Sequence, residues 1–514
     1  MEGKPEKTGK IYLVGAGPGD PGLMTIKAVE CLKRAEVVIY DFLANPALLA
    51  HVSPDAEVIY VGKSGSNHTL SQQGINDLIV KKALEGLIVV RLKGGDPFIF
   101  GRGGEEAEEL VQAGVDFEVV PGVTSAIAVP AYAGIPLTHR EHTSSVAFIT
   151  GHEDPTKSES SLDWDKIATG IGTLVFLMGV DNLTGIAARL IKAGRVSDTP
   201  AAVIRWGTTP EQTTIVGTLE DIASKVQAAG LRPPAILVVG GVVSLRSILN
   251  WYESLPLYGK RIMVTRTRTQ ASALSSALTS LGAGVIECPT IRLAPPEDWS
   301  PVDRALEALA DFNWLVLTSP NGVDFLFKRL HENGFDSRIM APVKLAVIGP
   351  GTAKRLLKFG LKADLMPKKF VAEDLARTLI SSGVSGRKVL MARSAQARTI
   401  LPEEITKAGA EVRDIILYQT LPAEGLPEDA RTALEQDQLD LVTFTSSSTV
   451  SSLMALLDGP QKEIVSKIKA ACIGPITAQT AREFGLDIAV EAKEHSIEGL
   501  VGAIKGFYGP GDNQ

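Results

Sequence analysis

The sequence predicts an α/β protein built from two two-lobed regions in succession. Short runs of Val, Ile and Leu end in glycine and alternate with amphipathic stretches along the 514 residues. Continuous apolar runs of this length are typical of parallel strands that helices bury on both faces. In open sheets of this kind ligands bind beyond the carboxyl ends of the strands, so we expect the chemistry at the glycine-terminated tips.

Six apolar runs place strands in the first half of the chain. They cover residues 11–17, 36–40, 87–95, 145–151, 173–179 and 235–241. Residues 121–136 (PGVTSAIAVPAYAGIP) are expected to form a helical segment that joins two α/β lobes, at 10–125 and 126–251. The sequence WYESLPLYG at 251–259 then breaks the pattern, and a new strand starts at residue 260. The main domain boundary is expected there.

The second half contains an internal repeat. The tripeptide GKR at 259–261 recurs as GRK at 386–388, and LTS at 317–319 recurs as FTS at 444–446, both 127 residues later. The segment IGPGTA at 348–353 returns as IGPITA at 473–478, 125 residues later. A period of this length is too long for a solenoid. It predicts two similar α/β lobes that face a shared cleft.

Composition and charge exclude several classes of protein. Hydrophobic residues make up 45% of the chain and charged residues 22%, which is typical of a folded globular protein. The net charge of -7 disfavours binding to nucleic acid, although a local basic pocket can still hold a small anion. Three scattered cysteines argue against a disulfide framework and a cysteine-rich metal site. We expect a cytoplasmic protein, because the charged N-terminus lacks a signal-peptide core and no apolar run is long enough to span a membrane.

Two glycine-rich segments follow strands in the first half. Residues 15–22 (GAGPGDPG) do not match the dinucleotide-binding pattern, because Pro18 lacks an N–H where pyrophosphate would need one. A tight structural turn is an equal alternative to a ligand loop there. Residues 91–104 (RLKGGDPFIFGRGG) combine glycines with fixed charges, which indicates close approach of the backbone to a ligand. Within them Asp96 either accepts hydrogen bonds from that ligand or caps a helix.

The motifs of the first half resemble those of the tetrapyrrole methylases, and most of all uroporphyrinogen-III C-methyltransferase, over about residues 10–251. The motifs that carry the similarity are VGAGPGDPGLMT, VVIYDFL, VGK, RLKGGDPFIFGRGG, VVPGVTSA, AGIPLTHR, FLMG and GTTPEQ. The resemblance implies a two-lobed methylase fold, S-adenosyl-L-methionine as methyl donor, no metal, and a homodimer formed through this half. A precorrin methylase of cobalamin synthesis is a rival that YDFL, VGK and GGDPFIFGRGG disfavour.

The resemblance also implies where the donor and the acceptor bind. The donor would lie between the lobes, in contact with Pro18, Gly94, Gly95, Asp96, Ile99, Thr124, Ser125, Met178 and Gly207. At the tip of strand 36–40, Asp41 would act as base or stabilise positive charge on the methylated ring, with Lys63 beside it. A loop Asp that caps the next helix is the alternative for Asp41.

The acceptor carries many carboxylates, so its pocket needs cations. Candidates are Lys63, Lys93, Arg102, His139 and Arg140. Arginine is favoured where a carboxylate is bound bidentately. Lys93 is equally compatible with a solvated surface charge, and His139 with a structural histidine.

The second half offers polar side chains at strand tips but no evident nucleophile, acid–base pair or metal cluster. They occur at corresponding places in the two copies of the repeat, and are Thr318, Ser319, Asn321, Thr352, Thr445, Ser446, Ser447, Ser448 and Thr477. Hydroxyls and backbone N–H groups at turns can hold the carboxylates of a tetrapyrrole. Helix N-capping explains any single one of them more simply.

This half is similar to uroporphyrinogen-III synthase over about residues 258–508, through VTR, TSPNGV, IGPGTA, MARS, LYQT, FTSSSTV and IGPITA. The resemblance implies one lobe at 258–292 and 422–510 and another at 293–421. Tyr418 in LYQT would assist departure of the hydroxyl group as hydroxymethylbilane closes with inversion of ring D. An amphipathic residue at a domain edge is its alternative. The polar tip residues and Arg393 in MARS would bind the substrate.

Together the two halves predict a bifunctional enzyme that makes uroporphyrinogen III and methylates it twice, at C-2 and C-7, to give precorrin-2. Whether precorrin-2 then serves siroheme or cobalamin synthesis stays open. A C-terminal half that only binds a tetrapyrrole, without synthase activity, is the alternative, because no catalytic constellation is evident there.

Overall fold

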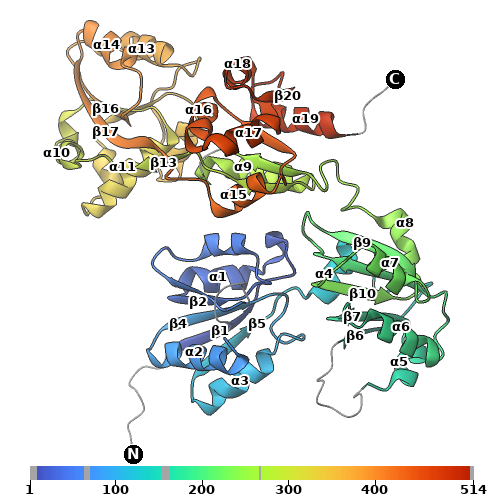
Figure 1. Cartoon of the computed structure of the whole chain (residues 1–514). Coiled ribbons are helices and arrows are strands. Elements are labelled where there is room, and N and C mark those ends of the chain that lie inside the picture. The colour runs from blue at the N-terminus through green and yellow to red at the C-terminus, as the bar shows by residue number, and fades with distance from the viewer. Residues whose placement is uncertain (1–8, 63–69, 152–161, 266–267, 510–514) are drawn as a thin grey trace, which may run out of the picture. The chain divides into compact units, whose positions relative to one another are not determined.

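The computed structural model describes residues 9–62, 70–151, 162–265 and 268–509, so Lys63 lies outside the described residues. The chain divides into two compact units. Residues 1–261, 276–285 and 505–514 form one, and residues 262–275 and 286–504 form the other. The described residues form four five-stranded sheets flanked by helices, which confirms the predicted α/β fold class (Figure 1).

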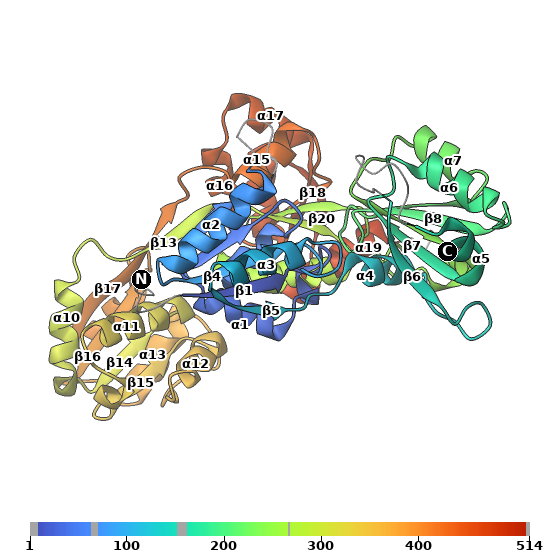
Figure 2. The same ribbon diagram turned by 90° about the horizontal axis from the view of Figure 1, so that it is seen from below.

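The first sheet is parallel throughout and has the strand order β3-β2-β4-β1-β5. Its strands are β1 (Lys10–Gly15), β2 (Val37–Tyr40), β3 (Glu57–Tyr60), β4 (Ile88–Lys93) and β5 (Asp116–Val120). Helix α1 (Ile26–Arg34) covers one face, and α2 (Gln72–Leu84) and α3 (Gly103–Gln112) cover the other (Figure 2). Because all five strands run the same way, their carboxyl ends meet at one edge of the sheet.

The second sheet is mixed and has the order β6-β7-β10-β8-β9, with β10 antiparallel to both of its neighbours. Its strands are β6 (Val146–Thr150), β7 (Thr173–Leu177), β8 (Pro200–Arg205), β9 (Thr213–Thr218) and β10 (Ala235–Val239). The helices that follow the first lobe are α4 (Ser125–Tyr132), α5 (Trp164–Gly170), α6 (Leu183–Lys192), α7 (Ile222–Ala228) and α8 (Arg246–Leu249). Helix α4 buries Ala126 and Val129 against this sheet, which places the predicted helical segment between the two sheets in the chain.

The C-terminal half contributes two further sheets. In the order of the first, its strands are β12 (Gly284–Glu287), β11 (Arg261–Val264), β18 (Leu441–Phe444), β19 (Lys469–Cys472) and β20 (Asp487–Glu491). In the order of the second they are β13 (Ile291–Ala294), β17 (Glu411–Pro422), β16 (Lys388–Ser394), β14 (Trp314–Leu317) and β15 (Lys344–Val347). The chain passes from the first to the second after β12 and returns after β17.

Eleven helices accompany these two sheets among the described residues. They are α9 (Arg268–Ser280), α10 (Ser300–Glu307), α11 (Pro320–Glu332), α12 (Pro350–Leu357), α13 (Ala372–Ser381), α14 (Ile400–Lys407), α15 (Glu428–Glu435), α16 (Ser447–Leu456), α17 (Gly459–Lys467), α18 (Pro475–Glu483) and α19 (Ile497–Tyr508). The sequence repeat is also a repeat of structure. The strands β11, β18 and β19 are neighbours in one sheet, as the corresponding strands β16, β14 and β15 are in the other. An α-helix follows each of these six strands in the chain.

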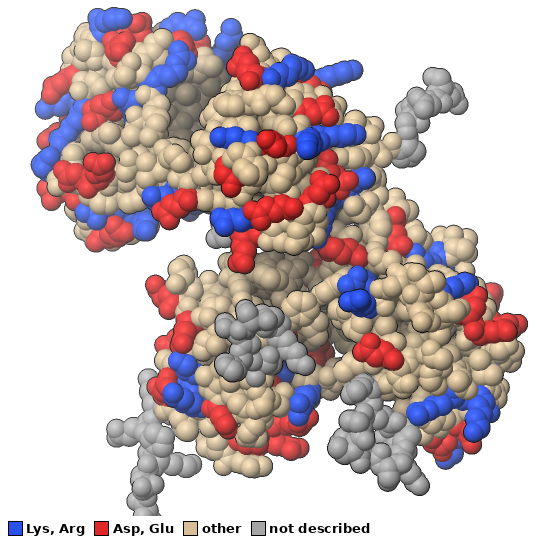
Figure 3. All heavy atoms as spheres, in the orientation of Figure 1, with Lys and Arg blue, Asp and Glu red and all other residues tan. Residues whose placement is uncertain are grey.

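The surface shows no dominant charge on the side drawn in Figure 3. Acidic and basic side chains are intermixed there over both units, without a continuous basic stripe among the described residues. Within the described ranges, no helix combines the length and hydropathy that a membrane crossing requires. The same residues contain no group of three His, Cys, Asp or Glu side chains placed to hold a metal ion.

Candidate active sites

Three glycines bring the strand tips of the first sheet into backbone contact. A Cβ on Gly15 would lie 2.4 Å from Gly122 Cα, and one on Gly122 would lie 2.2 Å from Gly95 O. Gly17 and Gly95 also exchange two backbone hydrogen bonds, of 3.2 and 2.7 Å. The two glycine-rich segments therefore lie against each other, and a side chain at Gly15 or Gly122 would clash with the neighbouring backbone.

Asp96 ties this arrangement together through backbone N–H groups. One carboxylate oxygen accepts a hydrogen bond from Phe98 N at 2.8 Å, and the other accepts one from Gly122 N at 3.0 Å. The helix-capping alternative for Asp96 is wrong, because α3 begins at Gly103 and its N-cap residue is Arg102. Asp96 instead fixes the loop after β4 to the loop after β5.

Three further residues expected at the donor site, Thr124, Ser125 and Gly207, lie on or against helix α4. Thr124 is its N-cap and Ser125 its first residue, and a Cβ on Gly95 would lie 3.7 Å from Ser125 N. Gly207 packs against Val129 on the same helix. Pro18 belongs to the loop whose next residue, Gly19, lies against Thr208 and Thr209. Ile99 and Met178 lie in the loops after β4 and β7, and both side chains are exposed.

Backbone strain is concentrated in the same loops. Among the described residues, six that are not glycine have positive φ, and five of them follow β4, β7 or β8. They are Phe100, Arg102, Met178, Trp206 and Thr208, and the sixth is Asp437. Such conformations persist only where the surroundings enforce them, and they are typical of functional sites. Residue type did not predict the five loop positions, since Phe, Arg, Met, Trp and Thr do not favour the left-handed region.

Asp41 is positioned at the tip of β2 by a buried arginine. Its Oδ2 lies 3.0 Å from Arg91 Nη2, and its Oδ1 accepts a hydrogen bond from Leu43 N at 3.1 Å. The helix-capping alternative for Asp41 is wrong, because Asn45 caps the short helix that follows. The next residue, Phe42, packs edge-on against Trp206 at 5.7 Å, so the Asp41 loop contacts the loop after β8.

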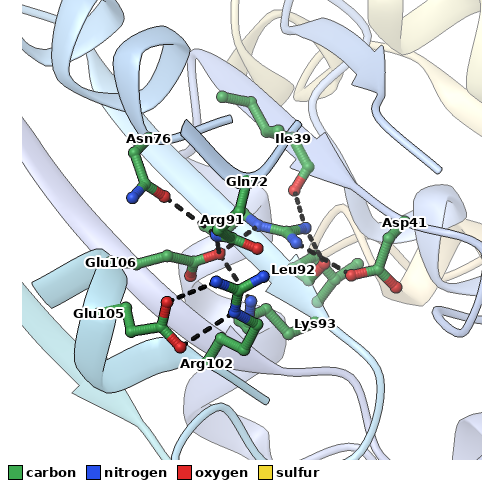
Figure 4. Close-up of polar contacts among 10 residues, drawn as sticks. All are labelled: Ile39, Asp41, Gln72, Asn76, Arg91, Leu92, Lys93, Arg102, Glu105 and Glu106. Carbon is green, nitrogen blue, oxygen red and sulfur yellow. Dashed lines mark hydrogen bonds and ion pairs between the residues drawn. The ribbon is translucent and has the colours of Figure 1, made fainter. Parts of the chain in front are cut away.

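Arg91 is held in place by a network of buried charged side chains (Figure 4). The side chain of Glu106 is 0% exposed, and its Oε1 lies 3.3 Å from Arg91 Nε and 2.7 Å from Lys93 Nζ. Gln72 donates to the same oxygen at 3.2 Å, whereas Oε2 has no hydrogen-bond partner among the described residues. Burial lowers the pKa of Lys93, and the nearby Arg91 charge lowers it further.

This network overturns the surface alternative for Lys93 and adds Arg91 and Glu106 to the residues of the candidate site. The surface-charge interpretation of Lys93 is wrong, because the residue is 5% exposed and bonded to Glu106. Sequence reasoning missed Arg91 as the partner of Asp41, and Glu106 as the common partner of Arg91 and Lys93. The available signal was the presence of two basic residues inside the apolar run of β4, since charges buried in a strand need partners.

The remaining cation candidates among the described residues of this half lie nearer the surface. Arg102 is exposed and forms an ion pair with Glu105. His139 accepts a hydrogen bond from Glu141 N at 3.2 Å through Nδ1, and its ring lies 5.0 Å from that of His142. The side chain of Arg140 is exposed.

In the C-terminal half the structure brings Tyr418 and Ser319 together. Their hydroxyl oxygens are 3.0 Å apart, and Ser319 Oγ also accepts a hydrogen bond from Gly322 N at 2.9 Å. Tyr418 is buried in β17, and its ring stacks on Phe325 at 5.3 Å. The phenol is therefore held in one orientation from two sides.

The other polar residues of this half lie where helices begin. N-capping is confirmed for Ser319 and Ser446, which cap α11 and α16. Thr352 and Thr477 are buried in the first turns of α12 and α18, and the other positions in this group are Thr318, Asn321, Thr445, Ser447 and Ser448. Arg393 is bound to the carboxylate of Asp414, with Nε at 2.8 Å from one oxygen, and to Ala397 O at 2.6 Å.

Two protein families match the chain. The model described as tetrapyrrole (corrin/porphyrin) methylases matches residues 10–223, and the one described as uroporphyrinogen-III synthase HemD matches residues 272–502. The porphyrin biosynthesis protein HemD of Ruminiclostridium josui is 37% identical over 494 residues, which cover 96% of this chain and 97% of that protein. The chain belongs to both families. The predicted fusion of a methylase half with a synthase half is thereby confirmed.

Two further similarities concern the methylase half. The S-adenosyl-L-methionine-dependent uroporphyrinogen III methyltransferase of Methanosarcina barkeri is 58% identical over 242 residues, which cover 47% of this chain and 95% of that protein. A crystal structure of the uroporphyrin-III C-methyl transferase of Thermus thermophilus with S-adenyl homocysteine has a TM-score of 0.40 and 41% identity, and covers 46% of this chain and 100% of that one.

Proposed function

We propose that the chain catalyses two consecutive reactions of tetrapyrrole biosynthesis. The synthase half closes hydroxymethylbilane to uroporphyrinogen III, and the methylase half methylates that product at C-2 and C-7 to precorrin-2. Membership of both families in one chain supports the pairing, because the product of one reaction is the substrate of the other. The methyl donor is S-adenosyl-L-methionine, on which the M. barkeri relative with 58% identity depends by its name.

The donor site comprises Pro18, Gly94, Gly95, Asp96, Ile99, Thr124, Ser125, Met178 and Gly207. Their fit rests on the glycine contacts, since Gly95 has φ +69° and leaves free the space that a Cβ would fill beside the start of α4. Asp96 holds the two loops that border this space at a fixed separation. When bound, the donor supplies an electrophilic methyl group, and the residues of the chain align the acceptor carbon with it.

The observation that carries the methylase assignment is the support given to Asp41. After methylation the ring gains positive charge and must lose a proton, and Asp41 stabilises the charge or accepts that proton. Its ion pair with Arg91 holds the carboxylate in place. Lys63, Arg102, His139 and Arg140 bind the carboxylates of the acceptor.

In the synthase half, the phenol of Tyr418 donates a proton to the departing hydroxyl group, which leaves as water. Ser319 orients that phenol through the contact at 3.0 Å. The capped helix starts hold the carboxylates of the bilane in one conformation, through Asn321, Thr352, Thr445, Ser446, Ser447 and Thr477, with Arg393 beside them. The substrate itself is prone to ionise and cyclise, so fixing its conformation is the main task of this half.

Each half has its own test on the full chain. Uroporphyrinogen III with methyl-labelled S-adenosyl-L-methionine is expected to incorporate two methyl groups per macrocycle. Hydroxymethylbilane alone is expected to give uroporphyrinogen III in excess over uroporphyrinogen I, which forms spontaneously. Formation of uroporphyrinogen I only would show that the C-terminal half merely binds tetrapyrroles.

We also propose a cytoplasmic homodimer formed through the methylase half. Exposed apolar side chains in that half support the assembly, namely Ile127, Ile248, Leu249 and Trp251. A reducing compartment suits the three buried, unpaired thiols of Cys31, Cys288 and Cys472. Sedimentation of the full chain and of an Ile248→Glu variant tests the dimer, since a buried charge at this surface should favour the monomer.

A further inference from the structure

The segment that leads from the methylase half to the synthase half is built into the methylase half. We call residues 246–258 the connector. Within it, Glu253 accepts hydrogen bonds from Gln212 Nε2 at 2.9 Å and Thr214 Oγ1 at 2.6 Å, and it forms an ion pair with Arg246. Arg246 in turn donates to Ala133 O at 2.5 Å, just beyond the end of α4. The connector is therefore attached to both β9 and α4.

A chain of hydrogen bonds runs from Glu253 to the glycine-rich loop at residues 15–22. The side chain of Gln212 is buried, and its Oε1 accepts a hydrogen bond from Thr208 N at 2.9 Å. Thr208 Oγ1 then accepts one from Asp20 N at 3.1 Å. Glu253 thus fixes the amide of Gln212, and Gln212 fixes Thr208 in its left-handed conformation at φ +69°.

A second route reaches the same loop through aromatic rings. The ring of Tyr132 on α4 lies 5.0 Å from that of Trp251 and 4.9 Å from that of Tyr252, both in the connector. Its hydroxyl donates to Asp20 Oδ2 at 2.6 Å. Asp20 also accepts from Gly22 N at 2.7 Å, so its carboxylate sets the shape of the loop. Both routes converge on Asp20.

We propose that Glu253 is a positioning residue for the methyl-donor site, acting through Gln212 and Thr208 on the loop at 15–22. The inference rests on the proposed function only in taking S-adenosyl-L-methionine as the ligand of this site. The connector is then part of the donor site as well as the link to the second enzyme. Its two routes hold the loop in the conformation that binds the donor, so loss of either route weakens donor binding without removing a group that touches the donor.

The test compares variants of the full chain. Glu253→Ala removes the acceptor for Gln212 and Thr214, and we expect it to weaken binding of S-adenosyl-L-methionine about tenfold by calorimetry. Methylation at saturating donor should stay within about twofold of wild type, since the reacting groups are unchanged. Glu253→Gln keeps an acceptor oxygen and should recover most of the affinity. The rate of methylation at saturating donor reports that the methylase half has folded.

The matched control is Glu211→Gln. Glu211 precedes Gln212 and pairs with Arg261 at 3.3 Å, but its side chain is not part of either route. Donor binding should therefore equal that of wild type. Tyr132→Phe removes the hydroxyl that binds Asp20 while it keeps the ring contacts, so it tests the second route without disturbing the connector.

Hydrogen exchange separates this inference from the proposed function. In Glu253→Ala, the amides of residues 15–22 should exchange faster than in wild type and in Glu211→Gln. If wild type does not bind the donor, the proposed function fails, and the exchange rates still decide the positioning role. Equal donor affinity and equal exchange in Glu253→Ala and wild type would overturn the inference.

Discussion

The two halves of the chain prepare their strand tips in different ways. In the methylase half Asp41 pairs with the buried Arg91, and Arg91 and Lys93 both pair with the buried Glu106. At the corresponding tips the synthase half places Ser319 and Ser446, neutral hydroxyls that cap helices. In the methylase half ion pairs fix a single group, Asp41. In the synthase half hydrogen-bonding groups are distributed over several helix starts.

This difference matches the demands of the two reactions. Methyl transfer to carbon needs one carboxylate in a fixed place, and buried charges fix it because unpaired charges inside a protein are costly. Ring closure of a reactive bilane needs a conformation to be selected, and many weak contacts achieve that. Single substitutions should therefore damage the methylase half more than the synthase half.

The largest expected effect is that of Asp41→Asn. The amide keeps the shape of the carboxylate but cannot accept the proton, so the rate of methylation should fall by about 10²- to 10⁴-fold. Calorimetry should show unchanged donor binding, and turnover of hydroxymethylbilane provides the internal control. Methylation at the wild-type rate would remove Asp41 from the reaction.

The next effect concerns the buried network. Glu106→Met leaves the charges of Arg91 and Lys93 without their common partner, and breaking a buried pair costs about 3–5 kcal/mol of unfolding free energy. Arg91 also loses its anchor, so we expect kcat for methylation to fall about tenfold. Urea unfolding and steady-state kinetics measure the two losses separately.

A double variant distinguishes support of Asp41 from mere stability. Lys93→Met with Glu106→Met removes one charge of each sign, so most of the stability should return while kcat stays low. Recovery of both stability and kcat would mean that Arg91 holds Asp41 in place without its ion pair to Glu106. The comparison in the synthase half is Asp303→Asn, which breaks the partly exposed pair with Arg329 and should cost less than about 1 kcal/mol.

A smaller effect is expected at Tyr418. Tyr418→Phe removes one hydroxyl and leaves the stacking on Phe325, so the synthase rate should fall about two- to tenfold, the range for a single hydrogen bond. The proportion of uroporphyrinogen I among the products should rise. Ser319→Ala should act in the same direction, and an unchanged product ratio in both would place catalysis elsewhere in this half.

The smallest effect is one in which the halves should not differ. Hydrogen bonds from Lys10 and Lys27 lower the pKa of Glu118 in the methylase half from 4.5 to about 2. In the synthase half, hydrogen bonds from Arg338 lower the pKa of Asp336 from 3.8 to about 2. A lowered folded-state pKa adds stability that is complete above the ordinary pKa and is lost as pH falls towards 2.

Both carboxylates lie at the surface, so their contributions should be small and similar. Thermal unfolding of Glu118→Gln and Asp336→Asn at pH 7 should show slight losses that disappear towards pH 2. A large loss of stability at only one of the two positions would mean that the two halves also differ in how much their exposed charges contribute to stability.

The sequence predicted the α/β class, the order of the two halves and the repeat in the second, because these follow from apolar periodicity and from short motifs. It also indicated Asp41 and Asp96 as strand-tip carboxylates. The partners of these residues were not predictable. Asp96 bonds to Gly122 N and Asp41 to Arg91, and contacts across a parallel sheet depend on strand order.

Other features could not be predicted from the sequence because they depend on backbone conformation or on contacts between distant segments. The left-handed φ of Met178, Trp206 and Thr208 is imposed by surrounding loops and not by residue type. The link from Glu253 to Asp20 passes through residues that are close only after two sheets and the connector have assembled. Arg91 and Lys93 inside an apolar run indicated buried charges, but the sequence does not show that Glu106 is their common partner.

The most direct test of two cooperating enzymes on one chain starts from hydroxymethylbilane and S-adenosyl-L-methionine together. The full chain is the only protein added, and the products are separated by isomer type and by number of methyl groups. We expect precorrin-2, with uroporphyrinogen III as the intermediate that accumulates in Asp41→Asn. Uroporphyrinogen I as the sole macrocycle, or uroporphyrinogen III that wild type leaves unmethylated, would contradict it.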